Sequence, residues 1–135
     1  MIESHRGRPH DAHYLAYFEC FNTGLYYEAH DVLEELWLED KEGSRGNFYK
    51  GLIQLAGAFV HMQKHSAIRP RLRPAAALLK LSRQNLTGYP RLYEALSVAA
   101  VLAMIERWLE VLEASRFEVD PLGEHEAPRL HLVRE

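Results

Sequence analysis

Apolar residues recur along most of this chain at helical spacing, and strand-like alternation of apolar and polar residues is nearly absent. Residues three or four apart lie on one face of an α-helix, so this spacing predicts helices that each bury one face. Gly24 is suited to end one helix in a left-handed conformation, and Pro74 is suited to the first turn of another. The predicted helices span about Asp11–Phe21, Leu25–Glu39, Asn47–His65, Pro74–Leu86 and Pro90–Ser115.

These elements predict an all-α fold, a single-domain, up-and-down helical bundle of about five helices. The connections between the helices are short, which favours antiparallel neighbours, and 135 residues suit one domain. We divide the chain into an N-terminal segment at 1–10, the bundle at 11–115 and an extended or irregular tail at 116–135, because prolines and a glycine interrupt the tail. For the tail we hypothesise a role in covering helix edges or in an oligomer contact.

Composition narrows the class of protein further. The hydrophobic fraction of 47% and the charged fraction of 26% are ordinary for a soluble globular protein, and a net charge of −3 gives no overall attraction to nucleic acid. The longest apolar run, Leu96–Ile105, is shorter than the roughly 18 residues that a membrane span needs. Residues 1–10 lack the apolar core of a signal peptide, so we expect a cytoplasmic protein with no membrane partner. Cys20 is the only cysteine, which excludes an intramolecular disulfide.

The second predicted helix carries polar residues where apolar residues are expected. With its residues placed at about 100° intervals, its apolar side chains form one wide arc, which Tyr27 and Leu38 extend. His30 and Glu34 fall inside this arc. A polar group in an apolar environment costs roughly 2–7 kcal/mol unless it finds a partner. We therefore expect the pair to need a compensating group.

The spacing of the pair permits a divalent metal site, for zinc among other ions. His30 and Glu34 are four residues apart, so both side chains project from one helix face and could bind one ion. The next helix adds His61 and, four residues on, His65, while Gln54 could orient a ligand or a bound water. An ion with three protein ligands and an open position would activate water for hydrolysis. The candidate metal ligands are thus His30, Glu34 and His61.

The same residues also have a structural explanation, which we favour. A histidine and a glutamate at this spacing can hydrogen-bond each other. Gln54 and His61 point away from the main apolar arc of their helix, toward water or a closely packed neighbour. Glu28 stands in the first turn of its helix, where a carboxylate is stabilised by about 0.3–1 kcal/mol. Trp37 is of a residue type that commonly anchors a core or an interface. None of these roles requires catalysis.

Charge is distributed unevenly along the chain. From Glu19 to Glu42 there are eight acidic residues and one lysine, whereas Ser66 to Arg91 holds no acid. The basic residues of that second segment are Arg69, Arg71, Arg73, Lys80, Arg83 and Arg91. A basic patch can contact phosphates, so nucleic-acid contact through residues 69–91 is a remote alternative. Complementarity between helices or subunits explains the asymmetry more simply, because no helix-turn-helix signature accompanies it.

Two blocks of sequence also carry a resemblance to a known family. The first block consists of Phe21, Asn22, Gly24, Tyr26, Tyr27, Glu28, Ala29, His30, Asp31, Leu33, Glu34 and Trp37. The second consists of Phe48, Tyr49, Gly51, Leu52, Ile53 and Gln54. With the alanine-rich stretch Ala75–Leu86, the chain over about residues 12–90 resembles the family catalogued as domain of unknown function 309.

The resemblance implies a small all-helical bundle without an established biochemical function. Some members carry the label "predicted metal-dependent hydrolase", and the matching motif residues here are Glu28, His30, Glu34, Trp37 and Gln54. We predict a non-catalytic module whose polar motif supports packing or a partner surface, with a homodimer as one form of partner. The alternative is a divalent-metal-dependent hydrolase that uses His30 and Glu34. No feature of the sequence identifies a small-molecule substrate.

Overall fold

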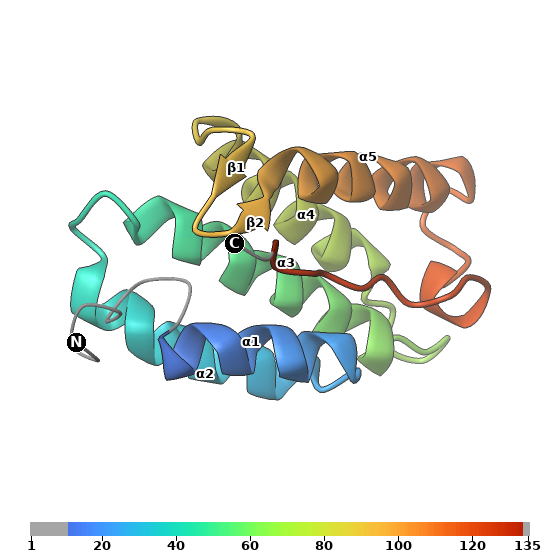
Figure 1. Ribbon diagram of the computed structural model, residues 1–135. Coiled ribbons are helices and arrows are strands. Elements are labelled where there is room, and N and C mark those ends of the chain that lie inside the picture. Colours follow the sequence, from blue (N-terminus) through green and yellow to red (C-terminus); the bar gives the residue numbers. More distant parts are fainter. Residues whose placement is uncertain (1–10, 134–135) are drawn as a thin grey trace.

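The computed structural model describes residues 11–133, and within them it confirms the predicted all-α class (Figure 1). Four helices lie close to their predicted positions, and the fifth begins later than predicted. The helices are α1 (Ala12–Asn22), α2 (Tyr26–Asp40), α3 (Gly46–Lys64), α4 (Leu72–Thr87) and α5 (Val98–Ala114). A two-stranded antiparallel hairpin, β1 (Leu92–Tyr93) and β2 (Leu96–Ser97), precedes α5, and a 3-10 helix, η2 (Pro121–Gly123), follows it.

Helix α3 lies at the centre of the bundle. It packs against α2 on one side and α4 on the other, while α1 packs on α2 and α5 packs on α4 (Figure 1). The apolar arc of α3 supplies the middle of the core, where Phe48, Leu52, Leu55 and Phe59 are fully buried. Because each helix packs mainly on its neighbours in the chain, short connections are enough to form the bundle.

An aromatic cluster joins the first three helices. The rings of Tyr17, Phe21, Tyr26 and Phe59 lie in edge-to-face, tilted or stacked pairs with centroids 5.0–5.9 Å apart. The buried Tyr17 hydroxyl donates a hydrogen bond of 2.6 Å to the Leu52 carbonyl oxygen, and burial raises the pKa of Tyr17 well above its ordinary value. Aromatic pairs of this kind contribute about 0.5–1.5 kcal/mol beyond the area they bury. The cluster thus fixes α1 and α2 against α3.

The prediction of a helix from Pro90 was wrong over its first turns, because the hairpin occupies them. Glu94 and Ala95 form its two-residue turn with φ angles of 51° and 62°, in the left-handed region that a tight hairpin turn requires. Helix α5 begins only at Val98, after the side chain of Ser97 accepts a hydrogen bond of 3.2 Å from the Ala100 amide. Ser97 is therefore the N-terminal cap of the helix.

Contacts from residues distant in the chain hold this turn. The Arg45 Nε donates to the Glu94 carboxylate at 3.0 Å, and the Tyr14 hydroxyl donates to the Glu94 carbonyl oxygen at 2.9 Å. Non-glycine residues adopt the left-handed conformation at a cost of roughly 1–2 kcal/mol each. These tertiary contacts help to offset that cost, and they are not visible in the local sequence.

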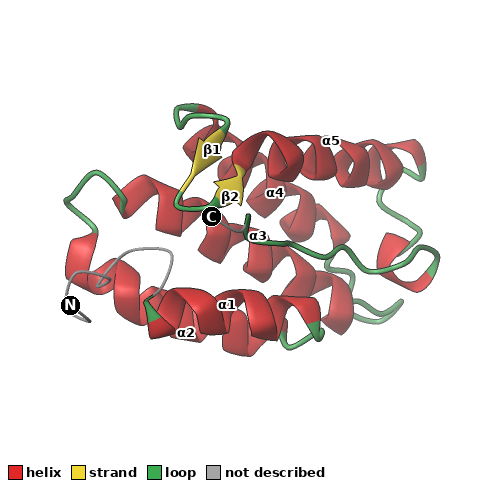
Figure 2. Ribbon diagram, in the orientation of Figure 1, coloured by secondary structure: helices red, strands yellow, loops and turns green. Residues whose placement is uncertain are grey.

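The C-terminal segment runs back across the bundle toward the hairpin (Figure 2). The side chain of Asn22 donates to the Leu130 carbonyl oxygen and accepts from the Leu130 amide, both at 2.7 Å. Leu132 then forms a bridge with Leu96 of β2, and the Val133 amide donates to the Ala95 carbonyl oxygen at 2.6 Å. The segment is therefore held at several points. Within residues 11–133, no helix has the length and apolar content needed to cross a membrane.

Candidate functional site

The polar residues His30 and Glu34 of α2 lie at the surface and not in the core. The helix buries Tyr26, Ala29, Leu33 and Leu36, whereas the side chain of His30 is 33% exposed and Glu34 is partly exposed. The expectation that His30 and Glu34 lie within a buried apolar arc was wrong. The buried arc is narrower than the 100° spacing of the residues suggested. Tyr27 and Leu38, which were expected to extend it, are 57% and 56% exposed.

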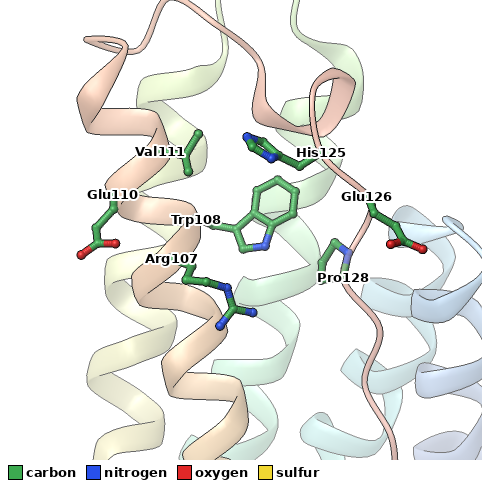
Figure 3. Close-up of a pocket in the computed structure, with 7 residues that line it drawn as sticks. All are labelled: Arg107, Trp108, Glu110, Val111, His125, Glu126 and Pro128. Carbon is green, nitrogen blue, oxygen red and sulfur yellow. The ribbon is translucent and has the colours of Figure 1, made fainter.

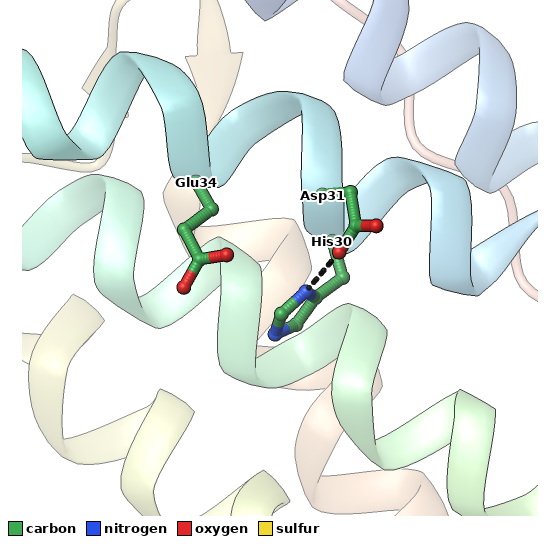
Figure 4. A group of neighbouring side chains, drawn as sticks. All are labelled: His30, Asp31 and Glu34. Atoms are coloured by element: carbon green, nitrogen blue, oxygen red, sulfur yellow. Dashed lines mark hydrogen bonds and ion pairs between the residues drawn. The ribbon is translucent and has the colours of Figure 1, made fainter.

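Three polar side chains gather on this exposed face of α2 (Figure 4). His30, Asp31 and Glu34 each offer one ligand atom, and these atoms lie within 4.8 Å of one another. The Nδ1 atom of His30 is 3.1 Å from Asp31 Oδ1. The predicted pair is thus accompanied by a second carboxylate, that of the exposed Asp31.

A small pocket of about 200 Å³ opens beside this cluster. Its walls come from three helices: Tyr27 and His30 from α2, Gly57, Val60 and His61 from α3, and Leu78 from α4. The ring of Tyr27 is parallel to that of His30, with centroids 6.5 Å apart, and Lys64 Nζ lies 5.7 Å from the Tyr27 centroid. Apart from the imidazoles of His30 and His61, the pocket is lined mainly by apolar groups.

The structure places His61 in the same pocket as His30. His61 was predicted to point away from the main apolar arc of its helix. In the structure, α2 and α4 flank that face of α3. The His61 Nδ1 atom is buried and has no hydrogen-bond partner among the described residues. Burial, followed by the charges of Arg71 and Lys64, lowers the pKa of His61. The lowered pKa favours the neutral form of the imidazole at pH 7. His61 lies outside the cluster of three ligand atoms.

The other motif residues lie elsewhere. Glu28 is exposed in the first turn of α2, close enough to Cys20 of α1 for its charge to contribute to the raised pKa of that thiol. Gln54 accepts a hydrogen bond of 2.7 Å from the Asn85 amide group of α4. Trp37 packs against the core, and Lys41 Nζ lies 5.7 Å from its ring centroid. None of these three lines the pocket.

The pocket also includes residues that sequence reasoning missed. Leu78 belongs to α4 and carries no signal that would associate it with His30, because only the packing of α4 on α3 brings it there. Gly57 of α3 is a second such residue. A Cβ atom at this position would lie 3.2 Å from Leu78 Cδ1 and 4.0 Å from His30 Cδ2, so the glycine keeps the pocket open.

Several basic residues of the 69–91 segment have contacts within the chain. Lys80 Nζ lies 3.6 Å from a Glu113 carboxylate oxygen, and Arg83 forms a 3.0 Å ion pair with Glu106, so α4 and α5 are electrostatically complementary. The Arg73 guanidinium lies 4.5 Å from the centroid of the Phe117 ring. These contacts support the explanation by helix complementarity.

Comparison with known proteins finds a match for the segment that carries the α2 and α3 residues of the site. Residues 14–69 match the model of the family described as "Domain of unknown function (DUF309)". "Uncharacterized protein YpuF" of Bacillus subtilis (strain 168) is 39% identical over 54 residues, which are 39% of this chain and 31% of that protein. The matched part is therefore less than a third of YpuF. No solved structure matches the chain.

The match confirms the family resemblance over the first two sequence blocks. It includes the α2 and α3 walls of the pocket, namely Tyr27, His30, Gly57, Val60 and His61. The stretch Ala75–Leu86, which also resembled the family, lies beyond the matched residues, and so does Leu78.

Proposed function

We propose that this chain, whose residues 14–69 match the DUF309 family model, is a non-catalytic helical module that binds a second copy of itself through the exposed face of α2. We call this surface the motif face and define it by Tyr27, His30, Asp31, Glu34 and Leu38. Residues 27, 31, 34 and 38 follow one helical stripe, so the motif face has apolar ends and an acidic centre. The observation that carries the proposal is the exposure of this face around an apolar pocket.

The composition of the motif face favours a protein partner. Tyr27 and Leu38 are both more than half exposed, and burying apolar surface yields about 25 cal/mol per Å². Within the described residues, neither Asp31 nor Glu34 forms an ion pair with a lysine or an arginine. A partner that supplies both an apolar side chain and a cation would therefore complement this face.

The loop after α3 has that combination. Ile68 is 91% exposed, and the neighbouring Arg69 forms no ion pair with another described residue. The loop lies beside the pocket, because the Arg71 amide donates to His65 Nδ1 at 3.0 Å and the charge of Arg71 acts on His61. A surface that holds both a pocket and an apolar side chain can be self-complementary across a two-fold axis. We therefore infer that Ile68 of each copy enters the pocket of the other.

Analytical ultracentrifugation over a range of protein concentrations tests the proposal. We expect a reversible dimer, which Ile68→Asp and Asp31→Arg should each weaken by at least about tenfold, or about 1.4 kcal/mol. Val119→Asp, at another exposed apolar position, is the matched control and should leave association unchanged. Combining Asp31→Arg with Arg69→Asp should restore part of the lost affinity. A chain that stays monomeric, or a dimer that Ile68→Asp leaves intact, would refute the proposal.

A second candidate function is divalent-cation binding, favoured by the cluster on α2. Two ligand atoms that share one ion at about 2.1 Å lie no more than about 4.2 Å apart. The 4.8 Å limit within which the atoms of His30, Asp31 and Glu34 lie is close to that spacing, and the donor set suits zinc or manganese. A zinc ion at this position would lower the pKa of its bound water to about 7. His61 lies outside the three ligand atoms, so these three side chains would hold the ion.

A further inference from the structure

A second concave surface lies on another side of the molecule, between α5 and the C-terminal segment. Two pockets of about 360 Å³ each follow α5 and share Arg107 and Pro128 as lining residues. We call the pair the tail groove. One end is formed around Trp108 and His125 (Figure 3), and the other around Met104 and Leu130. The sequence had suggested for this tail a role in covering helix edges or in an oligomer contact, and the groove adds a third possibility.

The floor of the tail groove is apolar. Met104 and Trp108 of α5 are 5% and 7% exposed, so little more than one edge of each side chain is accessible. Leu96 and Val101 line the Met104 end. An apolar cleft of this size is typical of sites for small organic molecules. The floor can therefore hold an alkyl chain or an aryl ring.

Positive charge is concentrated at the middle of the groove and at its Met104 end. The Met104 end is lined by Arg107, Arg129 and His131 and by no acidic residue. Glu110 and Glu126 line the Trp108 end, but Figure 3 shows their carboxylates pointing outward on either side of the indole ring. Arg107 forms no ion pair with any residue among 11–133. An anionic group on a ligand would therefore find a free guanidinium where the two pockets meet.

The indole of Trp108 adds a second donor. Its ring nitrogen lies on the side of the ring toward Arg107 and Pro128 (Figure 3). Trp108 donates no side-chain hydrogen bond to another described residue, although its ring makes edge contacts with Phe59 and His125. A ligand oxygen at the junction of the pockets could thus accept from both groups.

The tail wall of the groove is held in place without a ligand. Leu130 is fixed by its two hydrogen bonds to Asn22, and Leu132 is bridged to Leu96. A site whose walls are already ordered loses less conformational entropy when a ligand binds. The tail groove is therefore preformed, since its wall is ordered before a ligand binds.

We infer that the tail groove binds a small carboxylate with an apolar body, its carboxylate at Arg107 and its chain along Met104 and Trp108. A guanidinium recognises a carboxylate through paired N–H donors, while the apolar floor shelters the chain from water. Arg129 adds positive charge at one end of the site. This inference does not depend on the proposed self-association, which uses α2 and the loop after α3.

Methionine-methyl NMR with sodium octanoate as the probe tests the inference. We expect millimolar or tighter binding that shifts the methyl signal of Met104, which lines the groove, and leaves that of Met62, which is fully buried in the core. Octylammonium has the same chain with the opposite charge, and acetate has the charge without the chain. Each should bind at least about tenfold more weakly than octanoate.

Two variants at surface positions locate the site. Arg107→Gln should weaken octanoate binding at least about tenfold, and Ala100→Phe should fill the Met104 end and do the same. Lys50→Gln, which removes an exposed charge on α3, is the control and should leave the affinity unchanged. The inference fails if octanoate does not shift Met104, if octylammonium binds equally well, or if Arg107→Gln binds with wild-type affinity.

Discussion

His30 of α2 and His61 of α3 line one pocket together with Gly57. At Gly57, a Cβ atom would lie 4.0 Å from His30 Cδ2, so the absence of a side chain there leaves the space between the two helices open. The helical pattern predicted the faces that carry these histidines, but the packing of α2 and α4 on α3 decides that the faces meet.

The two glycines on this side of α3 should respond differently to alanine. At Gly51 a Cβ would lie 2.8 Å from Cγ of the fully buried Leu86, which cannot move freely. We expect Gly51→Ala to lower the free energy of unfolding by about 1–3 kcal/mol. At Gly57 the nearest atom is 3.2 Å away on the partly exposed Leu78, so Gly57→Ala should stabilise the protein by up to about 1 kcal/mol through helix propensity. Urea denaturation of both variants checks the contrast, and equal effects would contradict it.

Ala95 gives a test of the hairpin. Its φ of 62° costs roughly 1–2 kcal/mol in a non-glycine residue, which glycine relieves at an entropic cost of about 0.5–1 kcal/mol. Ala95→Gly should therefore raise the melting temperature slightly, whereas Ala95→Val should lower it. The matched control is Ala103→Gly at an exposed position inside α5, which should lower the free energy of unfolding by about 1 kcal/mol. If Ala95→Gly is as destabilising as the control, residue 95 does not adopt the left-handed conformation.

The hairpin also shows where local sequence pattern stops being sufficient. Leu92, Leu96 and Ala99 continue the helical spacing of the residues after them, so the pattern favoured a helix from Pro90. The observed turn depends on Arg45 and Tyr14, which are 49 and 80 residues away in the chain from Glu94. Only Ser97, a typical helix cap just before an apolar run, offered a local signal for the correct start of α5.

The candidate site could also be predicted only in part, because helical spacing shows which residues share a face but not how the helices pack. Spacing identified His30 and Glu34 as neighbours on one face, and Asp31 adds to them in the structure. Helical periodicity does not show which part of a wide apolar arc another helix covers, so the burial of the pair was overestimated. Leu78 reaches the pocket only through the packing of α4 on α3, which no local pattern reveals.

The environment of His61 predicts a pH dependence of stability. Burial and the nearby positive charges lower its pKa in the folded state below the ordinary 6.5, so the unfolded state binds this proton more readily. The stabilisation associated with neutral His61 is therefore complete above pH 6.5 and is lost as the pH falls from 6.5 to the folded-state pKa. His61→Gln, which does not titrate there, should reduce the dependence of the unfolding free energy on pH in that window. An unchanged slope in urea denaturation would contradict the argument.

Metal titration of untagged protein tests the role of the cluster on α2. If His30, Asp31 and Glu34 hold a divalent ion, zinc or manganese should bind with a stoichiometry near one per chain in isothermal titration calorimetry. His30→Ala and Glu34→Gln should then each weaken binding at least about tenfold, because each removes one of few ligands. Glu28→Gln is the control, since Glu28 lies in the first turn of α2 and outside the cluster, and it should bind as the wild type does. His61→Gln reports whether the second histidine contributes a ligand. If the wild type binds neither ion, or if the ligand variants change only the melting temperature, the cluster has no metal-binding role. The acidic centre of the motif face would then serve only in contact with a partner.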